Sequence, residues 1–347
     1  MRPAFRSALG VALVALGVAL CSAGCTSAGG TNGATPTAVS SAAALPSWRD
    51  GPAKQTIQKF VADVTRDGSP NYVPPAQRIA VFDNDGTLWS EQPLYFQFAF
   101  MLDQVKAAAP KHPEWKNNPA FKALVVKDYA ALASQEKQLL QLIAVANSGM
   151  TVDDYDKTIR NWLASARHPK FSRPYTELVY QPQLELLSYL RANGFKTFIV
   201  SGGTIEFMRP WAEKAYGIPP EQVVGSSQVV QYQMRNGQPV LVRQPKLDFV
   251  DDGPGKPVGI YRNIGRKPIL AFGNSDGDLQ MLQYTASGSG PHLALLVHHD
   301  DAVREFAYDR TSKIGKLDKA WDEAIADGWT VVSMKDDWQT IYPAPKQ

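Results

Sequence analysis

The stretch Ile79-Ala80-Val81-Phe82-Asp83-Asn84-Asp85-Gly86-Thr87 indicates the fold of this chain more directly than any other. Its first four residues are all apolar, which is typical of a buried strand in a parallel sheet. Asp83 and Asp85 then come where the strand ends and the chain turns. An open α/β sheet binds its ligands at this carboxyl end of the strands. One carboxylate there can attack a substrate while the other moves protons, although Asp-Gly-Thr is also ordinary turn chemistry.

Further apolar strands, separated by helical patterns, repeat this arrangement along the chain. They are predicted at Phe195–Val200, Pro268–Phe272 and Leu293–Val297, with a hairpin at Gln228–Val242 that turns at Asn236-Gly237. Alternating strands and helices predict an α/β fold with a Rossmann-like parallel sheet. Residues 92–182 interrupt the alternation, because their apolar residues recur at helical spacing without a clear strand. We expect this segment to be a helical subdomain inserted after the first strand.

Polar side chains suited to phosphoryl chemistry follow three of the predicted strands. Asp83 and Asp85 follow the first strand and Ser201 follows the second. The loop Gly273-Asn274-Ser275-Asp276-Gly277-Asp278 follows the third, and Lys256 opens a predicted helix shortly before it. Because strand ends converge on one crevice in a doubly wound sheet, we expect these groups to meet. Carboxylates that hold a divalent cation, together with a lysine and a hydroxyl, suit phosphoryl transfer.

Each of these groups also has a purely structural interpretation. The serine can cap a helix, and Asp276 and Asp278 can cap the helix that follows them. Lys246 and Lys267 compete with the predicted lysine, although the Gly-Lys pair has the better spacing. His298 and His299 close the fourth strand, and we assign them no catalytic role because such histidines are more often loop residues.

The order of these motifs resembles that of the haloacid dehalogenase superfamily. The motifs are Asp-x-Asp-Gly-Thr at 83–87, a strand with Ser-Gly-Gly at 201–203, Gly-Lys at 255–256 and Gly-Asn-Ser-Asp-Gly-Asp-Leu-Gln-Met-Leu at 273–282. Within the superfamily the chain is most similar to the phosphoserine-phosphatase-like branch with a helical cap. The resemblance implies a catalytic core at residues 47–91 and 183–347. It also implies a mobile cap at residues 92–182, whose closure excludes water and selects the substrate.

The same resemblance implies the roles of the site residues. Asp83 would be the nucleophile that forms an aspartyl phosphate, and Asp85 the acid and base that serves the leaving alcohol and then water. Ser201 and Lys256 would hold the phosphoryl group. Mg²⁺ would be bound by Asp83, by the backbone carbonyl of Asp85 and by the loop after the third strand. The remaining implied residues are Thr87, Gly202, Gly203 and Glu91 for the substrate, and Asn274, Asp276 and Asp278 for the metal.

Asn274 departs from the superfamily pattern, since an aspartate commonly ligates the metal at this position. An amide oxygen can coordinate a hard cation but brings no charge, and we expect Asp276 to make up the deficit. Dehalogenase members lack the second aspartate, so Asp85 points to phosphate esters. We therefore predict a Mg²⁺-dependent phosphomonoester hydrolase that acts on a small phosphorylated metabolite. The alternatives are a phosphotransferase with the same chemistry and an inactive lipoprotein that binds a phosphorylated ligand, which Asn274 favours.

The amino-terminal residues have the features of a bacterial export signal. Arg2 and Arg6 precede an apolar run from Ala8 to Leu20, which is too short to span a membrane stably. Ser22-Ala23-Gly24-Cys25 resembles a lipobox, which predicts lipidation of Cys25. The alternative is a plain signal peptide that is cut nearby and leaves a free secreted protein.

A segment of small polar residues follows this signal and resembles a flexible tether. We expect a signal peptide at 1–24, a tether at 25–46, and an exported lipoprotein anchored on the periplasmic or cell-surface side of a membrane. Removal of the signal leaves one of the two cysteines, so no intramolecular disulfide is expected. The formal net charge is +3 and no basic stripe is present, so nucleic acid is not an expected partner.

Overall fold

The computed structural model describes residues 45–128, 131 and 134–345. The predicted signal peptide, the predicted lipidation site Cys25 and most of the predicted tether lie outside these residues. Within the described part of the chain, no helix is both long enough and apolar enough to cross a membrane.

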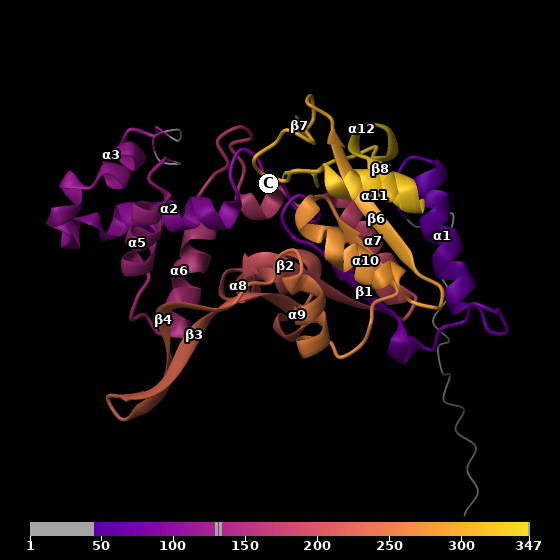
Figure 1. The fold of residues 1–347 in the computed structure, drawn as a ribbon, viewed down its shortest axis with the longest axis horizontal. Helices are drawn as coiled ribbons and strands as arrows, with labels where there is room; N and C mark the ends of the chain where they lie inside the picture. Colours follow the sequence, from indigo (N-terminus) through magenta and orange to yellow (C-terminus); the bar gives the residue numbers. More distant parts are fainter. Residues whose placement is uncertain (1–44, 129–130, 132–133, 346–347) are drawn as a thin grey trace, which may run out of the picture. The chain divides into compact units, whose positions relative to one another are not determined.

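A mostly parallel sheet forms the centre of the protein (Figure 1). Its strands are β1 (Ile79–Phe82), β2 (Lys196–Thr204), β3 (Val223–Arg235), β4 (Gln238–Phe249), β5 (Leu270–Gly273), β6 (Leu293–Asp300), β7 (Ala307–Tyr308) and β8 (Thr330–Ser333). The strand order is β4-β3-β2-β1-β5-β6-β7, and β8 also pairs with β6. Strand β1 lies between β2 and β5 and is parallel to both. The predicted Rossmann-like sheet is therefore confirmed, with the Asp83 strand near its middle.

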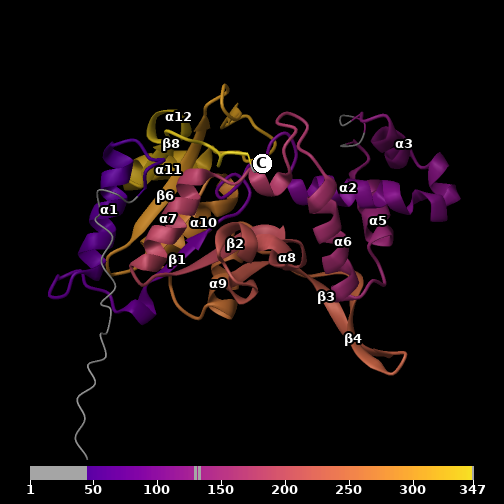
Figure 2. The ribbon, with the colours of Figure 1, turned by 180° about the vertical axis from the view of Figure 1, so that it is seen from behind.

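Helices cover both faces of this sheet, which explains the unbroken apolar run of β1. One face carries α1 (Pro52–Thr65), α7 (Gln181–Ala192) and α8 (Ile205–Tyr216), and the other carries α9 (Gly255–Asn263), α10 (Leu279–Ala286) and α11 (Lys319–Asp327). Ala80 and Phe82 pack with the first group, whereas Ile79 and Val81 pack with the second. Successive side chains of a strand point to opposite faces, so a strand covered on both sides needs apolar residues at every position. Figures 1 and 2 show the two layers from opposite sides.

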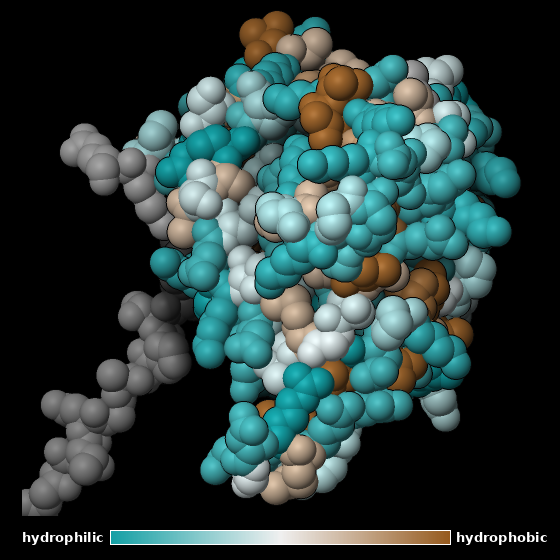
Figure 3. All heavy atoms as spheres, turned by 90° about the vertical axis from the view of Figure 1, so that its left-hand side faces the viewer, coloured by the Kyte–Doolittle hydropathy of each residue, from teal (hydrophilic) through white to brown (hydrophobic). Residues whose placement is uncertain are grey.

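The segment predicted to be inserted is helical where it is described. It contains α2 (Phe96–Ala108), α3 (Pro119–Val125), α5 (Glu136–Ala146) and α6 (Val152–Ser165). Leu102, Val105, Leu139 and Leu142 belong to an apolar cluster of its own, as expected of a subdomain. Its limits at residues 92 and 182 stay a prediction. The surface at this end of the molecule is mainly hydrophilic, with small separate apolar patches (Figure 3).

The predicted hairpin is also present and is longer than expected. Strands β3 and β4 extend beyond the sheet as a two-stranded ribbon (Figure 1). At the turn, Asn236 has φ 52° and Gly237 has φ 76°, the conformation that favours Asn-Gly in hairpins. The first residues of β3 pair in parallel with β2. The sequence did not separate this sheet strand from the hairpin, because one continuous strand serves both. A final short helix, α12 (Met334–Asp337), follows β8.

A fully buried carboxyl group lies between the sheet and α9. Asp251 is 0% exposed, and it packs so closely on Gly259 that a Cβ there would lie 2.1 Å from Asp251 Oδ1. Burial raises the pKa of Asp251 from 3.8 to about 7. The folded protein therefore holds this proton more tightly than the unfolded chain does. Its contribution to stability is full below about pH 4 and is lost as the pH rises through about 7.

We predict that Asp251→Asn raises the melting temperature relative to the natural protein more at pH 8 than at pH 5. The variant keeps the shape of the side chain but removes the cost of ionising it, which is about 1.4 kcal/mol for each unit of raised pKa. Thermal unfolding at both pH values measures the difference. Asp336→Asn, at an exposed position, is the control. An effect of Asp251→Asn that is equal at the two pH values would show that this pKa is not raised.

Candidate active site

A cleft of about 360 Å³ brings most of the predicted site residues together. It lies at the carboxyl ends of β1 and β2, where the parallel sheet opens. Its core side is lined by Asp83, Asp85, Glu91, Ser201, Gly202, Gly203, Lys256, Ser275 and Asp278. Its other wall includes Tyr95, Gln97, Phe98 and Met101 from the inserted segment. The groups that follow distant strands thus share one cavity.

The ammonium group of Lys256 joins three segments at the floor of the cleft. Its Nζ donates hydrogen bonds to Asp83 Oδ1 at 2.6 Å, to Asp278 Oδ1 at 2.6 Å and to the backbone oxygen of Val200 at 3.0 Å. The residue is 1% exposed. Burial by itself lowers the pKa of Lys256, but the two carboxylates outweigh this and raise it above its ordinary value. Lys256 therefore stays charged, and it fixes the orientation of Asp83.

The two carboxyl groups of the first motif have unusual environments. Burial, followed by the charge of Asp278, raises the pKa of Asp83 well above its ordinary value, although Lys256 opposes the shift. Burial also raises the pKa of Asp85 to about 6, against the hydrogen bond that Trp89 Nε1 donates to its Oδ1 at 2.6 Å. A carboxyl group with a pKa near 6 can both give and take a proton close to neutral pH.

The Ser-Gly-Gly motif forms the end of β2, which runs further than the predicted strand. Ser201 is buried, and its Oγ accepts a hydrogen bond from the backbone N–H of Gly203 at 3.1 Å. Gly202 and Gly203 line the cleft beside it. The role predicted for the motif in phosphate binding stays a prediction. Thr87 is different: it is fully buried, and its hydroxyl donates to Asn274 Oδ1 at 3.1 Å rather than lining the cleft.

The loop after β5 uses its acidic residues in two separate ways. Asp278 Oδ2 accepts hydrogen bonds from the backbone N–H groups of Asn274 and Ser275, at 2.9 and 3.0 Å. Together with the bond to Lys256, this engages both oxygens of Asp278 in holding the site. Asp276 is not among the residues that line the cleft. Its Oδ1 accepts from the backbone N–H groups of Asp318 and Ala320, at 2.9 and 3.0 Å, and so caps α11.

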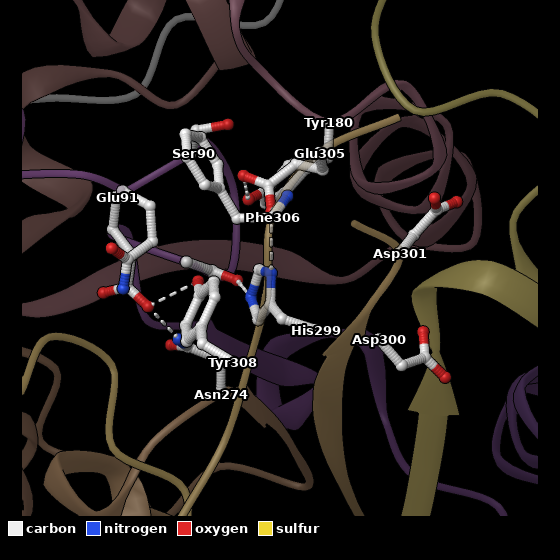
Figure 4. A network of polar contacts seen from close by, with 12 residues as sticks. Ser90, Glu91, Tyr180, Asn274, His299, Asp300, Asp301, Glu305, Phe306 and Tyr308 are labelled. Carbon is white, nitrogen blue, oxygen red and sulfur yellow. Dashed lines mark hydrogen bonds and ion pairs between the residues drawn. The ribbon is translucent and has the colours of Figure 1, made fainter. Parts of the chain in front are cut away.

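A buried network behind the first motif was not predicted from the sequence (Figure 4). Glu91 Oε1 accepts hydrogen bonds from Asn274 Nδ2 and from Tyr308 OH, both at 2.7 Å. Glu91 is 2% exposed, and burial raises its pKa well above the ordinary value. The predicted role of Glu91 in substrate binding stays a prediction. The structure adds that its carboxylate contacts Asn274, which is a predicted metal ligand.

A second branch of the network supports the motif loop itself. His299 Nε2 lies 2.8 Å from the backbone oxygen of Gly86, and His299 Nδ1 lies 3.4 Å from Glu305 Oε2. Because a carbonyl oxygen only accepts, Nε2 carries the proton in this contact. The ring of His299 also stacks on Tyr308, with centroids 4.4 Å apart. No short motif signals these contacts, and the one between His299 and Gly86 joins residues 213 positions apart. The one visible sign in the sequence is the histidine pair at the end of the fourth strand.

The family model for haloacid dehalogenase-like hydrolases matches residues 80–283 of this chain. The protein belongs to this family. The matched residues run from β1 to α10 and contain all four motifs of the cleft. The family membership confirms the prediction of a hydrolase of this superfamily with an α/β core. No curated protein matches the chain.

Several solved structures are similar to this chain. One is a protein of unknown function from Bordetella pertussis Tohama I, with 15% identity, a TM-score of 0.45 and coverage of 74% of this chain and 98% of that one. A conserved protein of unknown function from Anaerococcus prevotii DSM 20548 has 17% identity, a TM-score of 0.44 and coverage of 72% and 86%. A probable phosphoserine phosphatase from Vibrio cholerae has 16% identity, a TM-score of 0.37 and coverage of 74% and 69%. Similarities of this size carry no information about activity.

We predict that Asp276→Ala lowers the stability of the protein by about 1 kcal/mol, because α11 loses the acceptor that caps its first backbone N–H groups. Catalytic activity at a permissive temperature should be close to normal, since this carboxylate does not line the cleft. Thermal unfolding and a hydrolysis assay measure the two effects. A variant of normal stability that requires much more Mg²⁺ for activity would return Asp276 to the metal site.

Proposed function

We propose that this protein is a Mg²⁺-dependent phosphomonoester hydrolase that works through an aspartyl phosphate on Asp83. The observation that carries the proposal is the meeting of Asp83, Asp85, Ser201 and Lys256 in one cleft. Lys256 is bonded directly to the predicted nucleophile. Family membership adds that this is a hydrolase, and the second aspartate favours phosphate esters over the substrates of dehalogenases.

The residues of the cleft fit a magnesium ion. Asp83, Asp85 and Glu91 are carboxyl groups whose pKa values are all raised, first of all by burial. A divalent cation would supply positive charge that favours their ionised forms. The described residues contain no group of three or more His, Cys, Asp or Glu side chains arranged to hold a metal. Under this proposal the ion would be held by Asp83, the backbone oxygen of Asp85 and the amide oxygen of Asn274, which are hard oxygen ligands. Asn274 does not itself line the cleft, but it is hydrogen-bonded to Glu91, which does. When bound, it would polarise the phosphoryl oxygens.

In the proposed reaction, the carboxylate of Asp83 attacks phosphorus and the bond to the leaving alcohol breaks. Asp85 donates a proton to the alcohol oxygen and then removes one from the water that hydrolyses the aspartyl phosphate. The ammonium of Lys256 and the hydroxyl of Ser201 stabilise negative charge on the transferring group. Asp278 acts indirectly, because it holds Lys256 at a distance of 2.6 Å.

The leaving group of the substrate would face the inserted segment. Tyr95, Phe98 and Met101 form a largely apolar wall on that side of the cleft. A cavity of about 360 Å³ suits a small phosphorylated metabolite. This wall supports selection of the substrate by the inserted helices, which would act as a cap. Export and lipid attachment at Cys25 belong to the same proposal, and they are supported by the sequence features of the first 25 residues alone.

We predict that Asp83→Asn lowers the hydrolysis of an aryl phosphate at least about a thousandfold, because the amide is a poor nucleophile. The same change at the exposed residue Asp336 is the matched control and should leave the rate unchanged. Steady-state kinetics on the purified protein measures both. Near-normal turnover by Asp83→Asn would reject this nucleophile. If the unsubstituted protein binds phosphate but has no activity, the alternative of a lipoprotein that only binds a phosphorylated ligand is favoured. The neutral side chain of Asn274 is the feature that supports this alternative.

We also predict that removal of divalent cations with a chelator abolishes hydrolysis, and that added Mg²⁺ restores it. Without the cation, Asp83 would keep only Lys256 as a source of positive charge, and the transferring oxygens would be poorly neutralised. Activity before chelation, after chelation and after addition of Mg²⁺ is the measurement. Full activity in the presence of excess chelator would remove the metal from the mechanism.

A further inference from the structure

The side-chain amide of Asn274 is held at both ends. Its Oδ1 accepts a hydrogen bond from Thr87 Oγ1 at 3.1 Å, and its Nδ2 donates to Glu91 Oε1 at 2.7 Å. The same Glu91 oxygen accepts from Tyr308 OH at 2.7 Å. An oxygen that already accepts from a phenol requires a donor from the amide, and only Nδ2 can donate. Glu91 thus decides which end of the amide points away from it, and the oxygen faces the first motif.

The space for this carboxylate is made by two glycines that are far apart in the sequence. A Cβ on Gly86 would lie 2.0 Å from Asn274 Nδ2 and 2.4 Å from Glu91 Oε1. A Cβ on Gly315 would lie 1.8 Å from Glu91 Oε1. Both glycines have positive φ, 74° and 63°, which other residues rarely adopt. A side chain at either glycine would therefore clash with this carboxylate, so the backbone at both positions is shaped to accommodate Glu91.

Glu91 has no basic partner among the described residues, although it is buried. Lys256, the basic residue of the cleft, is bonded to Asp83 and Asp278 instead. Burial of an ionised carboxylate without a cation costs free energy, and a positive group bound nearby would offset this cost. Asn274, which the proposed function assigns to the metal, carries a neutral amide and is hydrogen-bonded to this carboxylate. The neutral amide of Asn274 and the carboxylate without a basic partner, Glu91, therefore form one hydrogen-bonded pair.

We propose that Asn274 and Glu91 act as one unit of the metal site, in which the amide oxygen is the ligand and Glu91 supplies the negative charge. This inference rests on the metal-dependent function proposed above. Glu91 is then a positioning residue that orients the ligand through a hydrogen bond and raises the affinity for the cation from one residue away. This role differs from the contact with substrate that the sequence predicts for Glu91.

The proposal makes the two side chains exchangeable. Glu91→Gln keeps an oxygen that can accept from Asn274 and Tyr308 but removes the negative charge. Asn274→Asp places two buried carboxylates at hydrogen-bonding distance, where they repel each other. The double variant E91Q/N274D again has one carboxylate and one amide, with the donor and the acceptor exchanged. The charge then lies on the ligand itself.

The test is a double-mutant cycle on the full-length protein, with Mg²⁺ binding measured by isothermal titration calorimetry and metal-free stability measured by thermal unfolding. We expect E91Q to weaken Mg²⁺ binding at least tenfold and E91Q/N274D to restore it to within about threefold of the natural protein. N274D alone should lower the metal-free melting temperature, and adding E91Q should restore it. Glu221→Gln, an exposed position, is the matched control and should bind Mg²⁺ normally.

The outcomes separate this inference from the proposed function. If the natural protein binds Mg²⁺ and E91Q binds it equally well, the role of Glu91 in the metal site is rejected while the function stands. A raised KM for the substrate with unchanged Mg²⁺ affinity would reject it in favour of substrate binding. If the natural protein binds no Mg²⁺, both proposals fail. If E91Q alone does not fold, the comparison of N274D with the double variant tests the inference. An equally low metal-free melting temperature in these two variants would show that the carboxylate and the amide cannot be exchanged between positions 91 and 274, and would reject the inference.

Discussion

The buried ammonium of Lys256 is the interaction on which the active site depends. It is bonded to a carboxylate after β1, a carboxylate after β5 and a backbone oxygen of β2, so it joins the three strand ends that form the cleft. Removal of one partner would leave a buried charge without a counter-charge. The free-energy cost of that charge is much larger than the stabilisation that the intact pair contributes. The site is therefore ordered by charge as well as by the sheet, and Asp83 is oriented before any substrate arrives.

Lys256 does not balance the charge of the cleft. Asp83 and Asp278 already share its ammonium, and the partly buried Asp85 and the buried Glu91 also line the cleft, so carboxyl groups outnumber basic groups there. The raised pKa values of Asp83, Asp85 and Glu91 have the same main cause, since burial removes water from each carboxyl group. The ammonium of Lys256 opposes the shift for Asp83 and Asp85 and does not cancel it. An arrangement of this kind favours the binding of a cation, because a positive charge stabilises the ionised form of each carboxyl group. It gives the proposed magnesium site a physical basis that is independent of the family resemblance.

Much of the fold could be predicted because its signals are local. The apolar run at Ile79–Phe82 identifies the central strand, since burial on both faces leaves no room for polar residues. Asn236-Gly237 identifies the hairpin, because few other residues adopt two successive positive φ angles. The double use of β3, as sheet strand and then ribbon, was not predicted. Pairing partners differ along this strand, and nothing in its own residues records the change.

By itself, the sequence determined the strand that carries Asp83, the four motifs and the family, because each depends on residues that are neighbours in the chain. The tertiary structure alone decided the partners of the acidic side chains. It turned Asp276 toward the first turn of α11 and brought Glu91 to Asn274, 183 positions away. Both outcomes depend on how β5, α11 and the segment after β1 pack together. A carboxylate in a sequence shows only that charge is available, and the fold determines which donor or cation it meets.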